Sequence, residues 1–178
     1  MADPIYAIGD IHGQLEMLHT TLEKIERDGG KDAKIVFLGD YVDRGENSKA
    51  VVELLMNGVQ SGKNWTCLLG NHDRMFTMFL EDYPRTDYRL KPGYDWFHKN
   101  IGGIQTMAAY GVEVHSESRL FQIHEDAKKA VPQTHLDFLT NLRENISKFI
   151  SLLPIDKPLL IHQTDRFIGM IRRMTWCG

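Results

Sequence analysis

The sequence predicts an α/β protein built on a parallel sheet. Three observations support this: three short apolar runs, a glycine that ends each run, and a helical pattern after each glycine. The glycines are Gly9, Gly39 and Gly70, which stand 30 and 31 residues apart. Strand, loop and helix units of this kind form right-handed crossovers, so the three loops should open at the same carboxyl edge of one sheet. Residues far apart in the sequence therefore become neighbours at that edge.

The first unit is a strand at residues 5–8 followed by a helix that ends near Asp28-Gly29-Gly30. The apolar positions of this helix share one face at helical spacing: Leu15, Leu18, Leu22 and Ile25. The Asp-Gly-Gly segment is a typical helix stop, because glycine readily adopts the backbone conformations that end a helix.

The second and third units repeat this pattern. A strand over 35–38 leads to a helix expected from about Ser48 to Asn57-Gly58, and a strand over 65–69 leads to a third helix. The apolar residues that mark these two helices are Val51, Val52, Leu54, Leu55, Met75, Met78 and Phe79.

The pattern changes in the second half of the chain. Prolines, tyrosines and charges fill residues 82–99, which indicates a loop or small helical insertion over the site. Helices are expected at 104–109 and from His135 to about Leu142. We predict a single domain over residues 1–178, recognisable over 1–140 and atypical over 141–178.

The composition is that of an ordinary soluble domain. Of the 178 residues, 42% are hydrophobic and 25% charged, and the net charge of -3 gives no general attraction to nucleic acid or an anionic membrane. Cys67 and Cys177 form neither a disulfide framework nor a zinc pattern, which agrees with a reducing compartment. The N-terminus lacks a signal peptide pattern, and no apolar run has membrane-spanning length. We expect a cytoplasmic protein without a membrane or nucleic-acid partner; its oligomeric state is left open.

Metal-binding side chains follow the three glycines. The segments read G-D-I-H-G, G-D-Y-V-D-R-G and G-N-H-D. Asp10 and His12 are two residues apart and can hold one cation, Asp40 can bridge two ions, and Asn71 offers an amide oxygen to the second. Mixed oxygen and imidazole ligands suit manganese, iron or zinc, and we expect two divalent ions, with manganese as the first choice.

Three further residues in these segments suit phosphoester cleavage. His72 can protonate a departing alkoxide, since the pKa of imidazole lies near neutral pH. Asp43 can hold that ring in the required tautomer. Arg44 presents a planar fork of donors that binds two phosphate oxygens and stays charged. Any one of these residues alone would suit a turn, a surface ion pair or a buried histidine, but together they predict a two-metal phosphoesterase.

The three segments resemble the signature of the calcineurin-like metallophosphoesterases, in particular the phosphoprotein phosphatase branch. Trp96, Gly102-Gly103, Thr106 and Tyr110-Gly111 are similar to a bacterial subgroup of serine/threonine protein phosphatases. The resemblance implies a four-layer β-sandwich flanked by helices, a dinuclear metal site, and Asp43 as the partner of His72. Asp73 stands where many members carry Glu.

The resemblance weakens after about residue 142. The family also carries a histidine in an H-A-G segment, a later histidine and usually a second arginine, and none is recognisable here. His162 follows an apolar run, but Gln163-Thr164 stand in place of Ala-Gly. Truncation and a frame shift both explain the tail. Read in the other frame, the last codons permit Asp-Leu-Val-Trp, which is similar to a segment of family members. The C-terminal strands are expected to be incomplete.

These observations predict a metal-dependent phosphomonoesterase, most closely a serine/threonine protein phosphatase that acts on phosphoproteins or small phosphoesters. Two alternatives remain. A symmetrical dinucleoside tetraphosphate hydrolase has the same three loops, and a catalytically impaired remnant that acts as a binding protein would lack the later histidines. Because the second ion would keep only Asp40 and Asn71, low activity is expected for this 178-residue form.

Overall fold

A computed structural model describes residues 4–144 and 172–174. His162 lies outside these described residues. The frame-shift hypothesis concerns the same tail, so the structure does not test it. The helices and strands follow in chain order: β1 Ile5–Ile8, α1 Leu15–Gly29, β2 Lys34–Phe37, α2 Ser48–Gln60, β3 Trp65–Cys67, α3 Asn71–Phe79, α4 Gly103–Ala109, α5 Leu120–Ala130, α6 Gln133–Thr140 and β4 Arg172–Met174.

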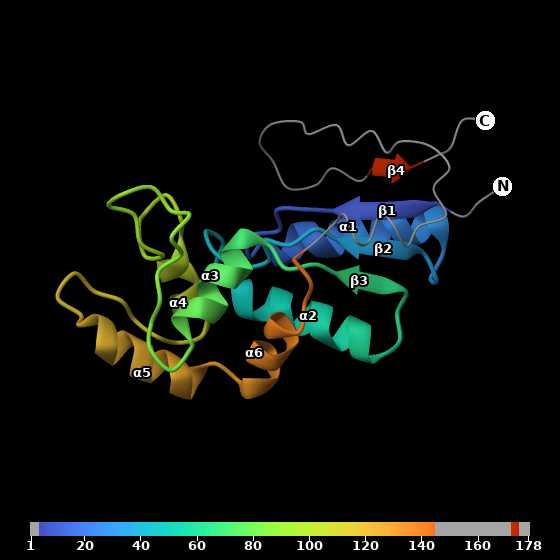
Figure 1. Cartoon of the computed structure of the whole chain (residues 1–178). Helices are drawn as coiled ribbons and strands as arrows, with labels where there is room; N and C mark the ends of the chain where they lie inside the picture. The colour runs from blue at the N-terminus through green and yellow to red at the C-terminus, as the bar shows by residue number, and fades with distance from the viewer. Residues whose placement is uncertain (1–3, 145–171, 175–178) are drawn as a thin grey trace.

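The described strands form one sheet in the order β3-β2-β1-β4 (Figure 1). β1 pairs with β2 in parallel, β2 pairs with β3 in parallel, and β4 joins the free edge of β1 in the antiparallel direction. The predicted α/β class with a parallel strand-helix core is confirmed. The second sheet of a sandwich would need strands beyond those that the described residues supply.

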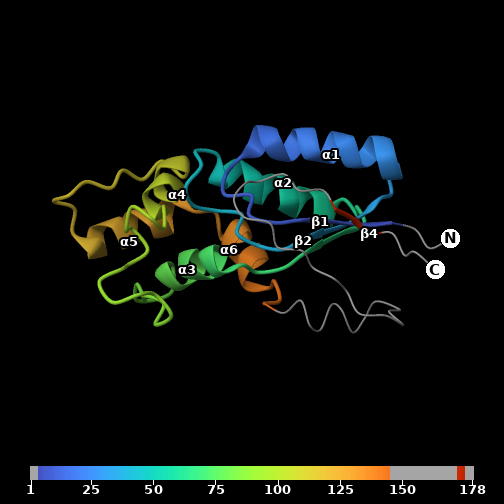
Figure 2. The ribbon, with the colours of Figure 1, turned by 90° about the horizontal axis from the view of Figure 1, so that it is seen from above.

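The helices are arranged in layers around this sheet. In the view from above, α1 and α2 lie on one side of the strands, and α3 and α6 lie on the other (Figure 2). α3, α4 and α5 extend beyond the carboxyl ends of the parallel strands (Figure 1). These helices therefore pack next to the loops that follow the parallel strands.

Two helix predictions need correction. α2 does not end at Asn57-Gly58 but continues to Gln60. Gly58 is retained inside the helix because the ring of Trp65 lies against it, where any Cβ atom would overlap the indole. The sequence pattern also missed α5, whose apolar face is short and interrupted by polar residues. The remaining expected helices are present, with ends shifted by about two residues or fewer, as is usual for helix boundaries.

The core is continuous from the sheet to the outer helices. Fully buried side chains include Tyr6, Phe37, Leu55, Phe76 and Leu139, which come from β1, β2, α2, α3 and α6. Residues 80–102 form turns and bends without a helix, as predicted for an insertion, and Arg74 of α3 anchors this segment through an ion pair with the buried Asp87. Across the described residues, no helix has the length and apolar character to span a membrane.

Candidate active site

The loops that follow β2 and β3 touch through their glycines. A Cβ atom on Gly39 would overlap the backbone of Gly70, and one on Gly70 would overlap the backbone nitrogen of Asp40. Gly39 also has a φ of 103°, a conformation that glycine adopts without steric cost. The glycines of the sequence motif are thus required for two loops to approach closely enough to share a site.

The site has an unusual backbone. Among the described residues, five non-glycine residues have positive φ, and all five lie in the predicted loops: Asp10, His12, Asp40, Asp43 and Arg44, with φ from 44° to 73°. Such conformations are costly for residues with a Cβ atom and cluster at functional sites. Here they turn consecutive side chains out of the strand direction and toward the same edge of the sheet.

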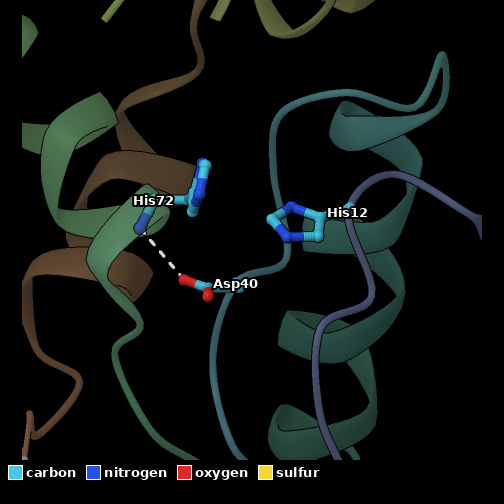
Figure 3. A group of neighbouring side chains, drawn as sticks. All are labelled: His12, Asp40 and His72. Carbon is cyan, nitrogen blue, oxygen red and sulfur yellow. Dashed lines mark hydrogen bonds between the residues drawn. The ribbon is translucent and has the colours of Figure 1, made fainter. Parts of the chain in front are cut away.

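Three of the side chains converge. One potential ligand atom from each of His12, Asp40 and His72 lies within 4.8 Å of the others. The two rings meet edge to face with centroids 4.6 Å apart, and the carboxylate of Asp40 lies between them and accepts the backbone N–H of His72 at 3.0 Å (Figure 3). Because the ligand atoms come from β1, β2 and β3 loops, the predicted convergence at the sheet edge is confirmed.

His12 is held in the form that binds a metal. Its Nδ1 donates to the carbonyl of Val42 at 2.8 Å, so Nε2 carries no proton in the neutral ring and faces the cluster. Burial, followed by the charge of Arg44, lowers the pKa of His12, and only the backbone acceptor and Asp40 oppose this. A neutral ring with one unprotonated nitrogen is the state required of a metal ligand.

Arg44 joins the two rings. Its Nη1 donates to Nε2 of His12 at 2.9 Å and its Nη2 donates to Nε2 of His72 at 3.2 Å. Because a guanidinium can only donate, both Nε2 atoms accept, which places the proton of each neutral ring on Nδ1. The exposed Arg44 side chain is thus aimed at the space that the predicted site occupies.

His72 is paired with Asp43, as predicted. The Nδ1 atom of His72 donates to Asp43 at 2.7 Å, and both side chains are at least 95% buried. The carboxylate of Asp43 also accepts from Trp96 and Thr106, two residues to which the sequence analysis gave no role at the site. No local sequence signal links them to Asp43.

Asp73 stabilises the loop that carries Asp40. Its carboxylate accepts backbone N–H groups from Asp40 and Tyr41, both at 2.8 Å, from Gly70 at 3.0 Å and from Val42 at 3.3 Å. Burial and the neighbouring charge of Asp40 raise the pKa of Asp73 to about 7, although the amide donors act in the opposite direction. From the sequence, Asp73 is notable only because many family members carry Glu at this position. In the structure, its carboxylate links two loops.

The other predicted residues lie at the rim. Asp10 and Asn71 are exposed, Asp10 after β1 and Asn71 at the first turn of α3. Asp10 does not belong to the converging group of three. Two other buried histidines lie away from this group: His124 bonds to the carbonyl of Glu81, and His135 bonds to the hydroxyl of Tyr110.

The donor set fits a divalent transition metal. Imidazole nitrogen and carboxylate oxygen suit manganese, iron or zinc, and the carbonyl of Val42 orients the His12 ring from behind. Which residues hold the ions stays a prediction.

The chain is similar to two kinds of curated hydrolase. It is 44% identical over 68 residues to a symmetrical bis(5'-nucleosyl)-tetraphosphatase of Cellvibrio japonicus, covering 38% of this chain and 24% of that protein. It is 42% identical over 79 residues to a putative serine/threonine-protein phosphatase of Caenorhabditis elegans, covering 43% of this chain and 17% of that protein. The matched segments therefore span a quarter or less of each relative.

Solved structures also match. A metallophosphoesterase from Sphaerobacter thermophilus aligns with a TM-score of 0.41 and 20% identity over 78% of this chain and 40% of that one. A cold-active protein-tyrosine phosphatase of a psychrophilic Shewanella aligns with a TM-score of 0.43 and 20% identity over 80% of this chain and 40% of that one.

The model of the calcineurin-like phosphoesterase family matches residues 3–162. The chain belongs to the calcineurin-like phosphoesterase family.

Proposed function

We propose that this chain is a metal-dependent phosphomonoesterase of the serine/threonine protein phosphatase type. The observation that carries the proposal is the chain of contacts from Asp43 through His72 to Arg44 and His12. It joins a potential proton donor, a phosphate-binding fork and a metal ligand within one small site. A phosphoester cleavage needs these three functions together.

In this proposal each of two metal ions is held by residues from both the rim and the converging group. Asp10, His12 and Asp40 hold one ion, and Asp40 and Asn71 contribute to the second. When bound, such ions polarise the phosphoryl oxygens and acidify water to a nucleophile near neutral pH. Nε2 of the neutral His12 ring accepts from Arg44 in the structure, so an ion would take the place of that hydrogen bond.

The remaining residues act on the substrate. Arg44 has an exposed side chain whose fork can donate to two phosphate oxygens and balance the charge that grows on them. His72 gives a proton from Nε2 to the departing alkoxide, while Nδ1 remains bonded to Asp43. The buried carboxylate of Asp43 stabilises the charged ring that precedes this transfer.

A second candidate is supported by a specific finding. The tetraphosphatase of Cellvibrio japonicus is 44% identical over 68 residues, a level similar to that of the phosphatase relative. The three loops alone do not determine whether the substrate is a phosphoserine or a dinucleoside tetraphosphate, because both substrates would present a phosphoryl group to the same metals and arginine.

One assay separates the candidates. Purified chain with manganese is given a phosphoserine peptide, diadenosine tetraphosphate and p-nitrophenyl phosphate, and released phosphate or nucleotide is measured. We expect manganese-dependent release from the peptide and from p-nitrophenyl phosphate, abolished in the His12→Ala variant. Symmetrical cleavage of diadenosine tetraphosphate without peptide hydrolysis would favour the second candidate. Phosphate binding without hydrolysis of any of the three would overturn both.

A further inference from the structure

The carboxylate of Asp43 is enclosed by donors that come from outside the metal-site motifs. It is fully buried, and besides His72 it accepts from the hydroxyl of Thr106 at 2.7 Å and from the indole N–H of Trp96 at 3.1 and 3.0 Å to its two oxygens. A buried carboxylate is costly unless donors satisfy it, so these contacts stabilise its charged form. Thr106 bonds to Oδ1, whereas Oδ2 receives His72 and also lies within hydrogen-bond distance of Trp96.

Thr106 contacts Asp43 twice. Its hydroxyl oxygen accepts the backbone N–H of Asp43 at 2.8 Å and its own proton goes to the Asp43 carboxylate at 2.7 Å. Asp43 has a φ of 73°, which is unfavourable for a residue with a Cβ atom. The one hydroxyl therefore holds both the side chain and the strained backbone of Asp43.

Trp96 is fixed by packing. Its ring stacks on Phe76 at 5.5 Å between centroids and contacts Phe79 at 5.1 Å. On another side Gly103 approaches the indole so closely that a Cβ atom there would be within 2.7 Å of ring carbons. An indole held from both α3 and α4 presents its N–H in one direction, toward Asp43.

We propose that Trp96 and Thr106 are positioning residues for His72. By holding the Asp43 carboxylate they keep His72 with Nδ1 bonded and Nε2 facing the site, so that Nε2 can take up a proton and then, from the charged ring, deliver it to the leaving group. This inference rests on the proposed function, because it assumes that His72 is the proton donor. It adds that the segment between α3 and α4, together with α4 itself, takes part in proton delivery and does not merely cover the site.

The leaving group provides the test. Cleavage of 2,4-dinitrophenyl phosphate needs little help from an acid, since dinitrophenolate leaves readily, whereas phenyl phosphate depends on protonation. We expect Thr106→Val and Trp96→Phe to lower kcat for phenyl phosphate about 10-fold, while kcat for 2,4-dinitrophenyl phosphate changes less than about 3-fold. Thr106→Ser, which keeps the hydroxyl, restores the phenyl phosphate rate.

Two comparison variants make the result specific. Thr77→Val also removes a buried threonine hydroxyl, one that bonds to the carbonyl of Arg74 on α3, and we expect equal effects on the two substrates. His72→Asn marks the full loss of the acid and should show the largest difference between substrates. If His72→Asn itself shows no difference, the proposed function fails; if only Thr106→Val and Trp96→Phe show none, the positioning role is wrong.

A second measurement does not require turnover. The 15N shifts of His72 in the metal-free chain report which ring nitrogen carries the proton. We expect the Nδ1–H tautomer in the parent chain and in Thr77→Val, and a mixture of tautomers in Thr106→Val and Trp96→Phe. An unchanged single tautomer in both variants would overturn the inference even if the chain hydrolyses no substrate.

Discussion

The two halves of the candidate site are organised differently. The acid half, defined as Asp43, His72, Trp96 and Thr106, is buried and each polar group in it has a protein partner. The metal half, defined as Asp10, His12, Asp40 and Asn71, has only His12 buried, and Asp10 and Asn71 are exposed. The first half is fully enclosed by protein, whereas the second is only partly buried.

The difference follows from what each half must bind. A proton donor works best when its orientation is fixed before the substrate arrives, and packing with hydrogen bonds can do this without a ligand. Carboxylate ligands of a metal repel one another when no ion is present. The bound cation therefore provides much of the stabilisation that brings the ligands together. We expect perturbations of the metal half to change binding and activity, and perturbations of the acid half to change rate and stability.

The largest effect is expected from Asp40. Asp40→Asn removes the charge of the proposed bridging ligand but keeps its shape, and we expect kcat to fall by at least about 100-fold with a matching loss of manganese affinity. Tryptophan fluorescence should stay close to that of the parent chain, because Trp96 belongs to the acid half. A shifted tryptophan emission spectrum together with unchanged manganese affinity would contradict the division of the site into a metal half and an acid half.

Metal titration sharpens the same comparison. Because the second ion has only Asp40 and Asn71 among the predicted ligands, we expect one manganese to bind at least about 10-fold more tightly than the other. Calorimetry of the metal-free chain measures both affinities. Two equally tight ions with vigorous hydrolysis would mean that residues outside 4–144 and 172–174 complete the site.

Gly102 tests the packing between the segment before α4 and the loop that carries the acid half. A side chain there would collide with the backbone of Arg44 and would sit at a φ of 96°. We expect Gly102→Ala to lower the free energy of unfolding by about 2–4 kcal/mol, measured by urea denaturation. Gly93→Ala is the matched control, since Gly93 has a φ of 83° but no neighbouring atom within 4 Å. Its cost should be about 1–2 kcal/mol.

The smallest effect concerns the support beneath the acid half. His135 of α6 bonds to the hydroxyl of Tyr110 at 3.0 Å, and the Tyr110 ring packs on Phe76. Burial lowers the pKa of His135 from its usual 6.5, so the unfolded chain takes up this proton more readily than the folded one. The contribution of His135 to stability is therefore present above pH 6.5 and falls as the pH decreases below that value. Unfolding curves between pH 5 and 7.5 should be less pH-dependent in His135→Gln than in the parent chain.

Short-range patterns predicted much of the fold and the rim of the site. The strands, the helices that follow them and the convergence of the three loops come from periodicity and from a glycine at each strand end. The predicted end of α2 was wrong because Gly58 lies inside the helix, where it packs against the ring of Trp65. No local sequence pattern reveals this contact. α5 was missed because its apolar face is interrupted.

The sequence by itself determined the chemical types at the site and their approach to one edge, since strand-loop-helix units have a fixed hand and glycine permits close contact. Only the tertiary structure decided that Thr106 and Trp96, 63 and 53 residues from Asp43, enclose its carboxylate. It also decided that Asp73 joins two loops through four amide groups. Those contacts depend on how the second half of the chain packs over the first, because hydrogen-bond geometry between distant segments is set by packing and not by spacing along the chain.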